Sequence, residues 1–303
     1  MQQADTNNQA VELKSERWRI RLQPEFGLQT QLCQVSVENQ WLHLMPDCTE
    51  PDAPLSSANF HMLPYSNRIK DGQFTFDGAK VELDDATNHA IHGALRKRAW
   101  EVTEQSSTNV IAQYDTQRHG SVNWPWPIQA QISYQLQDHM LISEMALTNN
   151  GETAMPAGMG WHPYFCRTIA GANPQLLLPT KGVYPDTNGD CLPTGSPVAL
   201  PEFLDFNSVK ALDSSKRMDH CLSGFRSPAT IIWPEAKIKL EIQASDNCQH
   251  LVLFNPDASY FAVEPVTNAN DGFNLQSAGV DAGVTILQPG DTLKAHMRMV
   301  LLD

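Results

Sequence analysis

The sequence has no long hydrophobic run. Nowhere do 18 or more apolar residues follow one another, and residues 1–10 have neither a basic start nor an apolar stretch. We therefore expect neither a membrane-spanning helix nor a secretory leader. Cys-x-x-Cys pairs are absent as well, and the six cysteines are scattered along 303 residues. Because a chain of this size needs no disulfides, reduced thiols in the cytoplasm are the simplest interpretation.

Basic residues are also few. The 21 Lys and Arg residues against 34 Asp and Glu give a formal net charge of −13. Nucleic acids and anionic membrane surfaces are bound by basic patches, so neither partner is expected. No Gly/Ser-rich linker, repeat or long charge block divides the chain. The sequence therefore predicts a mobile tail over residues 1–10 and one domain over residues 11–303.

Helical periodicity is scarce, and alternation of apolar and polar residues takes its place. Over residues 128–136 every second residue is apolar and the others are Gln or Ser, which is typical of a half-buried strand. Residues 140–148 alternate similarly, and Asp138-His139 between the two runs predicts a hairpin turn. Similar short runs recur at residues 18–22, 230–233, 238–242, 251–254 and 293–301. Many short strands separated by turn signals imply an antiparallel sandwich or barrel.

One segment presents a titratable imidazole where glycines and a proline constrain the backbone. It is Gly158-Met159-Gly160-Trp161-His162-Pro163-Tyr164-Phe165. Taken alone, the segment has two interpretations. The glycines and proline relieve crowding in a bulge and end a strand, or His162 is a functional group.

A second segment favours the functional interpretation. Glu264 stands directly after the apolar run of residues 260–263 and directly before Pro265, which is expected to end the strand. Two further segments place a polar side chain beside Gly, Pro or an aromatic residue, and they contain Arg68 and His92. Loops of this kind often carry function, and buried polar groups need partners. The candidate functional residues are thus Arg68, His92, His162 and Glu264.

Four motifs of the chain resemble, in order, those of the aldose 1-epimerase (mutarotase) family. They are the arginine motif Asn67-Arg68-Ile69, the histidine motifs His92-Gly93 and His162-Pro163-Tyr164-Phe165, and the glutamate motif Glu264-Pro265-Val266-Thr267. The resemblance spans residues 64–274. It implies an all-β fold, a large twisted antiparallel β-sandwich or supersandwich, whose concave face gathers the four functional side chains on one ligand.

The resemblance also implies an activity. The protein would be a cofactor-independent isomerase that interconverts the α and β anomers of a free monosaccharide. Opening a cyclic hemiacetal removes a proton from the anomeric hydroxyl and delivers one to the ring oxygen. Glu264 would be the base and His162 the acid, and the same two groups exchange roles when the ring recloses. Neither a redox cofactor nor a metal is required.

The remaining candidates would bind the sugar. Arg68 and His92 would hydrogen-bond it and stabilise charge that develops at the ring oxygen. Asp219, in Arg217-Met218-Asp219-His220-Cys221, resembles the family's substrate-binding aspartate, with a solvated loop aspartate as the alternative. A free histidine has a pKa near ~6.5, so we expect negative charge on Glu264, and on Asp219 if it lies close, to keep His162 protonated.

Two rival functions stay open. A hexose-6-phosphate 1-epimerase would need additional cations near the pocket, and the candidates are Lys70, Arg96, Lys97 and Arg98, although the cluster at residues 96–98 is usually a solvated turn. A carbohydrate-binding sandwich without catalysis is the other rival, because fold alone does not imply function. The identity of the sugar and the choice between monomer and homodimer are open as well.

Other polar and aromatic residues are expected to be structural. Trp124-Pro125-Trp126 more often closes an end of a sandwich than faces a sugar, and Cys166 is expected to pack in the core. His220, His250 and His296 lack neighbours at metal-ligand spacing. The sequence therefore predicts no metal site.

Overall fold

Strands dominate the structure, a computed structural model that describes residues 10–84 and 89–302. The mobile tail expected over residues 1–10 lies almost wholly outside the described residues. The described helices are α1 (Thr116–His119), α2 (Gly272–Ser277) and the 3₁₀ turns η1 (Pro24–Phe26), η2 (Lys70–Gly72), η3 (Glu202–Leu204) and η4 (Pro234–Ala236). No helix in this part of the chain is both long and apolar enough to cross a membrane.

The strands form one nine-stranded sheet and several smaller ones, and the described ladders are antiparallel. In spatial order the nine-stranded sheet contains β10 (Glu101–Gln105), β11 (Asn109–Asp115), β12 (Ile128–Gln137), β13 (Met140–Asn149), β27 (Thr292–Leu302), β23 (Ile238–Ala244), β22 (Ala229–Trp233), β17 (Gln175–Leu177) and β20 (Lys210–Ala211). A four-stranded sheet contains β1 (Val11–Lys14), β2 (Trp18–Gln23), β3 (Gln29–Val37) and β4 (Gln40–His43).

An eight-stranded sheet carries the candidate site. It contains β19 (Val198–Ala199), β18 (Gly182–Val183), β21 (Met218–Ser223), β24 (His250–Asn255), β25 (Tyr260–Val266), β15 (Gly160–Trp161) and β5 (His61–Met62), while β16 (Tyr164–Cys166) also pairs with β25. Three two-stranded sheets pair β6 (Arg68–Ile69) with β9 (Ala90–Ile91), β7 (Gln73–Phe76) with β8 (Ala79–Glu82), and β14 (Met155–Ala157) with β26 (Thr285–Leu287).

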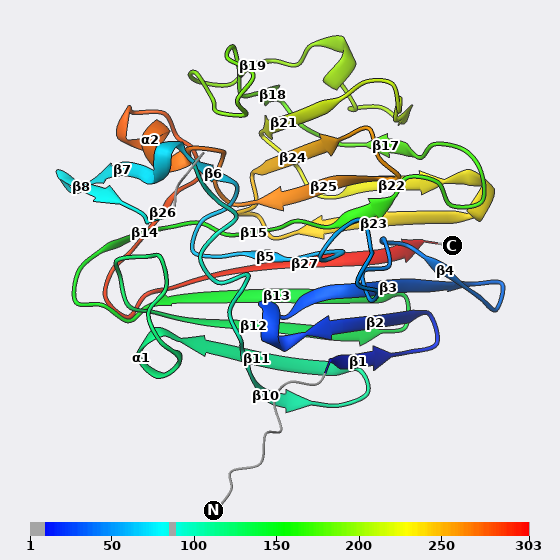
Figure 1. Cartoon of the computed structure of the whole chain (residues 1–303). Coiled ribbons are helices and arrows are strands. Elements are labelled where there is room, and N and C mark those ends of the chain that lie inside the picture. Colours follow the sequence, from blue (N-terminus) through cyan, green and yellow to red (C-terminus); the bar gives the residue numbers. More distant parts are fainter. Residues whose placement is uncertain (1–9, 85–88, 303) are drawn as a thin grey trace, which may run out of the picture.

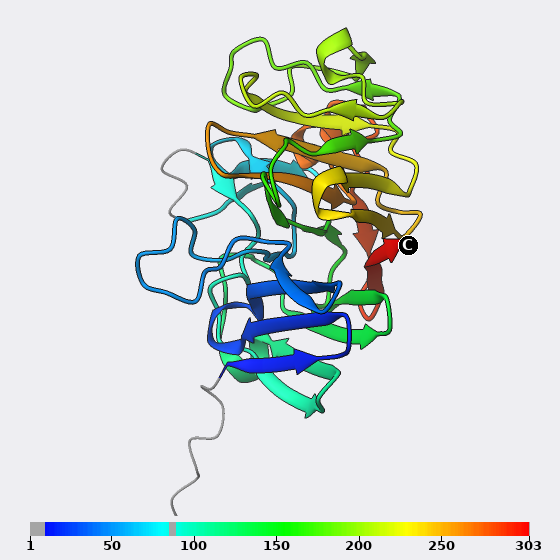
Figure 2. The ribbon, with the colours of Figure 1, turned by 90° about the vertical axis from the view of Figure 1, so that its right-hand side faces the viewer.

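A continuous apolar core joins the nine-stranded sheet to the two sheets that face it. The ring of Trp233 in β22 lies 6.4 Å from that of Phe261 in β25. The hydroxyl of Tyr134 in β12 lies 3.1 Å from Oγ1 of Thr30 in β3. Figure 1 shows the four-stranded sheet in front of β11 and β12, and Figure 2 shows the two sheets together in the lower half of the molecule. The structure therefore confirms the antiparallel β-sandwich predicted from the sequence.

The alternating segments are strands, as predicted. In β12 the apolar residues are buried while the intervening ones are half-buried or exposed. Gln137 pairs with Met140, so Asp138-His139 is a two-residue hairpin turn. The other five runs are parts of β2, β22, β23, β24 and β27.

The prediction that Pro265 ends its strand is wrong. β25 continues through Pro265 to Val266, which pairs with Gly160 on one side and His250 on the other. Proline cannot donate to a ladder, but it is tolerated beside an interruption. The neighbouring strand is interrupted at His162-Pro163, between β15 and β16, and this interruption accommodates the proline.

Buried histidines should make the fold sensitive to acid. His61 is fully buried between the sheets, and burial lowers its pKa to about 3. An unfolded histidine has a pKa near ~6.5, so below that pH the unfolded chain binds a proton that the folded chain excludes. The free energy of unfolding should therefore decrease as the pH is lowered below ~6.5, by up to about 1.4 kcal/mol per pH unit for each such histidine.

Urea unfolding between about pH 7 and about pH 5 measures this slope. His61→Gln removes one of the titrating groups, so the variant should lose stability less steeply as the pH falls. An equal slope in the variant and the wild-type protein would contradict the assignment of acid sensitivity to His61.

Candidate functional site

The register of the eight-stranded sheet places His162 opposite Glu264. β25 pairs with β15 at Gly160 and with β16 at Tyr164 in one continuous register, although His162-Pro163 lies between the two strands. Side chains two residues apart in a strand point to the same face. His162 and Glu264 are therefore directly across from each other, from segments about a hundred residues apart in sequence.

The same face continues over the neighbouring strands. Glu264 pairs with Val252 of β24, which pairs with Cys221 of β21. Two residues from Cys221 along the same strand, and therefore on the same face, Asp219 of β21 pairs with Phe254 of β24. The opposite face of β25 packs in the main core, so the strand is buried on both sides. This explains why Glu264 interrupts an otherwise apolar segment.

Arg68 and His92 approach this face from the small β6–β9 sheet. The amide of His92 donates to the carbonyl of Asn67 at 2.7 Å, and both residues have left-handed backbones, with φ of 64° and 50°. A Cβ on the next residue, Gly93, would lie 2.3 Å from the carbonyl oxygen of Leu63. Glycine is therefore required where the two segments cross.

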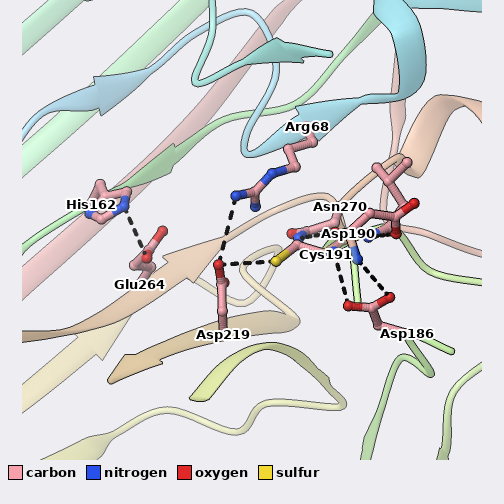
Figure 3. Close-up of polar contacts among 9 residues, drawn as sticks. Arg68, His162, Asp186, Asp190, Cys191, Asp219, Glu264 and Asn270 are labelled. Carbon is pink, nitrogen blue, oxygen red and sulfur yellow. Dashed lines mark hydrogen bonds and ion pairs between the residues drawn. The ribbon is translucent and has the colours of Figure 1, made fainter. Parts of the chain in front are cut away.

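One cavity of about 100 Å³ brings the five predicted site residues together. It is lined by Asn67, Arg68, His92, His162, Tyr164, Asp219, Phe254 and Glu264. Figure 3 shows His162 directed at Glu264 and Arg68 directed at Asp219. Asn67, Tyr164 and Phe254 were not predicted to line the site, because only the tertiary structure places them there.

His162 and Glu264 form a buried contact. Nε2 of His162 lies 3.2 Å from Oε1 of Glu264, and their side chains are 6% and 1% exposed. The ring of Phe60 stacks on His162 with centroids 4.6 Å apart. Oε2 of Glu264 is buried and has no hydrogen-bond partner among the described residues. The pair therefore combines an imidazole nitrogen with a buried carboxyl group, one oxygen of which is left without a partner.

Comparisons with known proteins agree with this fold. The sequence model described as Aldose 1-epimerase matches residues 34–300. The chain belongs to the aldose 1-epimerase family.

Several relatives illustrate this membership. The uncharacterized protein YihR of Escherichia coli K12 is 27% identical over 252 residues, which cover 80% of this chain and 79% of YihR. The aldose 1-epimerase of the same organism is 27% identical over 124 residues, or 40% of this chain and 35% of that enzyme. A galactose mutarotase-like protein of Clostridium acetobutylicum superposes with a TM-score of 0.83 at 16% identity, covering 100% of this chain and 97% of that one.

The pKa values of His162 and Glu264 contradict the expected protonation of His162. Burial lowers the pKa of His162 to about 3. Burial, followed by the negative charge of Asp219, raises the pKa of Glu264 well above its ordinary value. The expectation that Glu264 and Asp219 keep His162 protonated is therefore wrong for the sugar-free protein. Removal from water disfavours both charged forms, so the pair holds one proton in a neutral arrangement.

The hydrogen bond from Arg96 determines which ring nitrogen of His92 carries the proton. Nη1 of Arg96 lies 3.1 Å from Nδ1 of His92, and a guanidinium can only donate, so Nδ1 accepts. Burial and then the neighbouring positive charges hold the pKa of His92 well below its ordinary value. A neutral imidazole that accepts at Nδ1 carries its proton on Nε2. His92 therefore offers one N–H donor to the site.

The basic cluster at residues 96–98 is only partly a solvated turn. Lys97 and Arg98 are exposed, as expected. Arg96 is half-buried, and its guanidinium lies 4.9 Å from the centre of the Phe60 ring. The expectation of a solvated turn is thus wrong for Arg96, because a hydrogen-bond acceptor and an aromatic face draw its side chain toward the site.

Asp219 lies in β21, not in a solvated loop. Its Oδ2 is 3.7 Å from Nη2 of Arg68, and its side chain is 28% exposed. The thiol of Cys191 donates to the same oxygen at 3.2 Å. Cys191 was not predicted as a site residue, because nothing in its segment indicates that the thiol meets β21.

The residues expected to be structural lie outside the cavity. Trp124 is buried, and its ring lies 5.7 Å from that of Phe74. Nε2 of His250 lies 3.0 Å from the Tyr184 hydroxyl. Among residues 10–84 and 89–302, no three His, Cys, Asp or Glu side chains are grouped so that they could hold a metal ion.

Proposed function

We propose that the protein is an aldose 1-epimerase that interconverts the α and β anomers of a free monosaccharide by acid/base ring opening and reclosure. The buried contact between His162 and Glu264 is the observation that carries this proposal. Proton removal from the anomeric hydroxyl and proton delivery to the ring oxygen require a base and an acid side by side, and both groups line one cavity. Arg68, His92 and Asp219 line the same cavity and supply donors and an acceptor for sugar hydroxyls.

The proton of the pair first moves from Glu264 to His162 across their 3.2 Å contact. Two proton transfers with the sugar follow. Oε2 of Glu264, which is unpaired, takes the proton of the anomeric hydroxyl, while Nε2 of His162 gives one to the ring oxygen. The C1–O5 bond breaks and C1 becomes an aldehyde. Rotation about C1–C2 presents the other face of the aldehyde to O5. Reclosure reverses both proton transfers, so the enzyme returns to its starting state.

The one proton that His162 and Glu264 share is sufficient for both halves of this cycle. A carboxylate with an imidazolium opens the ring, and a carboxylic acid with a neutral imidazole closes it. In water the charged arrangement would dominate, since a free glutamate has a pKa near ~4.3 and a free histidine near ~6.5. Burial of His162 and Glu264 favours the neutral arrangement and so stabilises the protonation state of the open-chain intermediate.

A pH profile tests this proton count. The active pair holds one proton, so kcat/KM should fall at low pH, where the pair gains a second proton, and at high pH, where it loses the last. The pKa of His162 at about 3 places the acid limb far below neutrality. The raised pKa of Glu264 places the basic limb above the ordinary carboxyl range. Polarimetry across pH measures both limbs, and an acid limb near ~6.5 would contradict this assignment.

Arg68→Lys should mainly weaken sugar binding. A point charge cannot reproduce the planar fork of guanidinium donors that reaches Asp219 and the cavity. We expect KM to rise about tenfold, with a smaller change in kcat. Arg98→Lys, at an exposed position, is the matched control. A fall in kcat at unchanged KM would place Arg68 in the chemical step instead.

The hexose-6-phosphate rival receives less support. Of its four candidate cations, Lys70, Lys97 and Arg98 are exposed and do not line the cavity. Arg96 reaches the site, but its guanidinium already contacts His92 and Phe60. A phosphate group would have to compete for that one cation.

Anomer exchange on a panel of sugars separates the candidate functions. Saturation-transfer NMR should show accelerated exchange of glucose, galactose or another free aldose. Exchange confined to glucose 6-phosphate would instead establish the phosphate-specific rival. Sugar binding without faster exchange would indicate a carbohydrate-binding protein and refute the proposed catalysis.

A further inference from the structure

The thiol of Cys191 and the guanidinium of Arg68 hold the same oxygen of Asp219. Sγ of Cys191 donates to Oδ2 at 3.2 Å, and Nη2 of Arg68 lies 3.7 Å from that atom. Oδ1 has no hydrogen bond or ion pair with any described residue. Figure 3 shows Arg68 and Cys191 both directed at the same oxygen of Asp219. The orientation of Asp219, which lines the cavity, is thus restrained through one of its two carboxylate oxygens.

The loop that presents Cys191 is itself strongly constrained. The Asp186 carboxylate accepts from the amides of Gly189 at 2.8 Å and Cys191 at 2.9 Å. The side-chain amide of Asn270 donates to the carbonyl of Cys191 at 3.0 Å. Cys191 has a φ of 61°, a conformation that a residue other than glycine keeps only where its surroundings impose it. Contacts from both sides therefore hold the thiol in place.

Asp219 would meet the end of a bound sugar that is remote from C1. It lies on β21, and β24 separates this strand from β25, which carries Glu264. Adjacent strands are about 4.8 Å apart, so the two carboxyl groups approach the cavity from backbones about 10 Å apart. A pyranose whose C1 lies at His162 and Glu264 would extend toward Asp219.

We propose that Cys191 is a positioning residue for sugar binding. With Arg68 it holds one oxygen of Asp219, so that the other accepts a hydrogen bond from a sugar hydroxyl remote from C1. This inference rests on the proposed function. It specifies a substrate with a free hydroxyl at that end of the ring, because a carboxylate accepts from a hydroxyl and repels an anionic substituent.

The chemistry of the thiol suits this role. Burial, and then the negative charge of Asp219, raise the pKa of Cys191 to about 12. The group therefore stays a thiol at neutral pH and retains the proton that it donates. It is also a poor nucleophile, since the thiolate is the reactive form.

Cys191→Ala and Cys191→Ser test the proposal together. Alanine removes the donor, and KM for anomer exchange should rise about threefold to tenfold with kcat within about twofold, as expected for a lost hydrogen bond to a charged group. Serine keeps a donor, so its KM should stay within about twofold of wild type. Cys166→Ala is the matched control, because Cys166 is also a half-buried thiol but, unlike Cys191, is not hydrogen-bonded to Asp219. Its KM should not change.

Two results would overturn the proposal. The first is an unchanged KM in Cys191→Ala, and the second is a rise in Cys191→Ser as large as in Cys191→Ala. If Cys191→Ala does not fold, Cys191→Gly replaces it, because glycine adopts the φ of 61° without strain and also lacks the thiol donor. KM must then rise in Cys191→Gly by the amount expected for alanine.

Failure of the proposed function is distinguishable from failure of this inference. A wild-type protein that binds a sugar without exchanging its anomers refutes the catalysis. In that case the dissociation constants of the wild-type, Cys191→Ala and Cys191→Ser proteins, measured by calorimetry, still test the positioning role. Equal constants for wild-type and Cys191→Ala would refute it.

Discussion

Replacing Glu264 with glutamine should lower kcat for anomer exchange by about a hundredfold or more, the usual cost of losing a general base. Glutamine preserves the shape of the side chain but cannot accept the proton of the anomeric hydroxyl. KM should change little, because Arg68, His92 and Asp219 remain to bind the sugar. Exchange rates from saturation-transfer NMR at saturating sugar measure the effect.

The structure supplies a matched control for this substitution. Glu144 of β13 pairs directly with His296 of β27, as Glu264 is opposed to His162. This second pair lines a surface groove of about 290 Å³, where Glu144 is exposed to solvent. Glu144→Gln should leave kcat within about twofold of wild type. Equal activities of Glu264→Gln and Glu144→Gln would exclude Glu264 as the base.

His162→Asn should cause a loss of similar size. Asparagine cannot deliver a proton to the ring oxygen, so kcat should fall about a hundredfold. Groups that act as a unit are not additive, so the double variant with Glu264→Gln should be little slower than either single variant. A double variant slower by the product of the two losses would show that the residues act in separate steps.

The control for His162→Asn is His296→Asn on the outer face of the sheet. Asparagine is smaller than the imidazole that stacks on Phe60, so the folded fraction of His162→Asn must be verified by circular dichroism. A fully folded His162→Asn protein that retains the activity of His296→Asn would remove His162 from the chemistry.

Strands were predictable from the sequence because local alternation encodes them. The hairpin of β12 and β13 is an example, since its apolar face and its turn can be read from adjacent residues. The extension of β25 through Pro265 was not predictable. Whether a strand tolerates proline depends on its neighbour, and that neighbour lies about a hundred residues away.

The site was predictable only in its residue types. Four motifs identified Arg68, His92, His162 and Glu264, but the contact between the last two depends on the register that β25 keeps on both sides of Pro163. The protonation state was mispredicted for a related reason. Reference pKa values apply to solvated groups, and burial reverses the direction expected for His162.

The contacts that Arg96 and Cys191 make with site residues could not be predicted from their local sequence. Arg96 lies in a basic cluster whose other members are exposed, and its hydrogen bond to His92 depends on how that turn packs. Cys191 reaches Asp219 only because Asp186 and Asn270 hold its loop. Such contacts are tertiary, so the residue type alone does not indicate them.

The opposition of His162 and Glu264 also determines which changes the protein can tolerate during evolution. One residue inserted between Phe261 and Glu264 would turn the carboxylate into the apolar interior, because successive side chains in a strand alternate between faces. Exchanging Phe254, by contrast, would reshape one wall of the cavity while His162 and Glu264 still face each other. The shape of the cavity can therefore change by substitution, whereas changes in length should be confined to loops beyond the ends of β24 and β25.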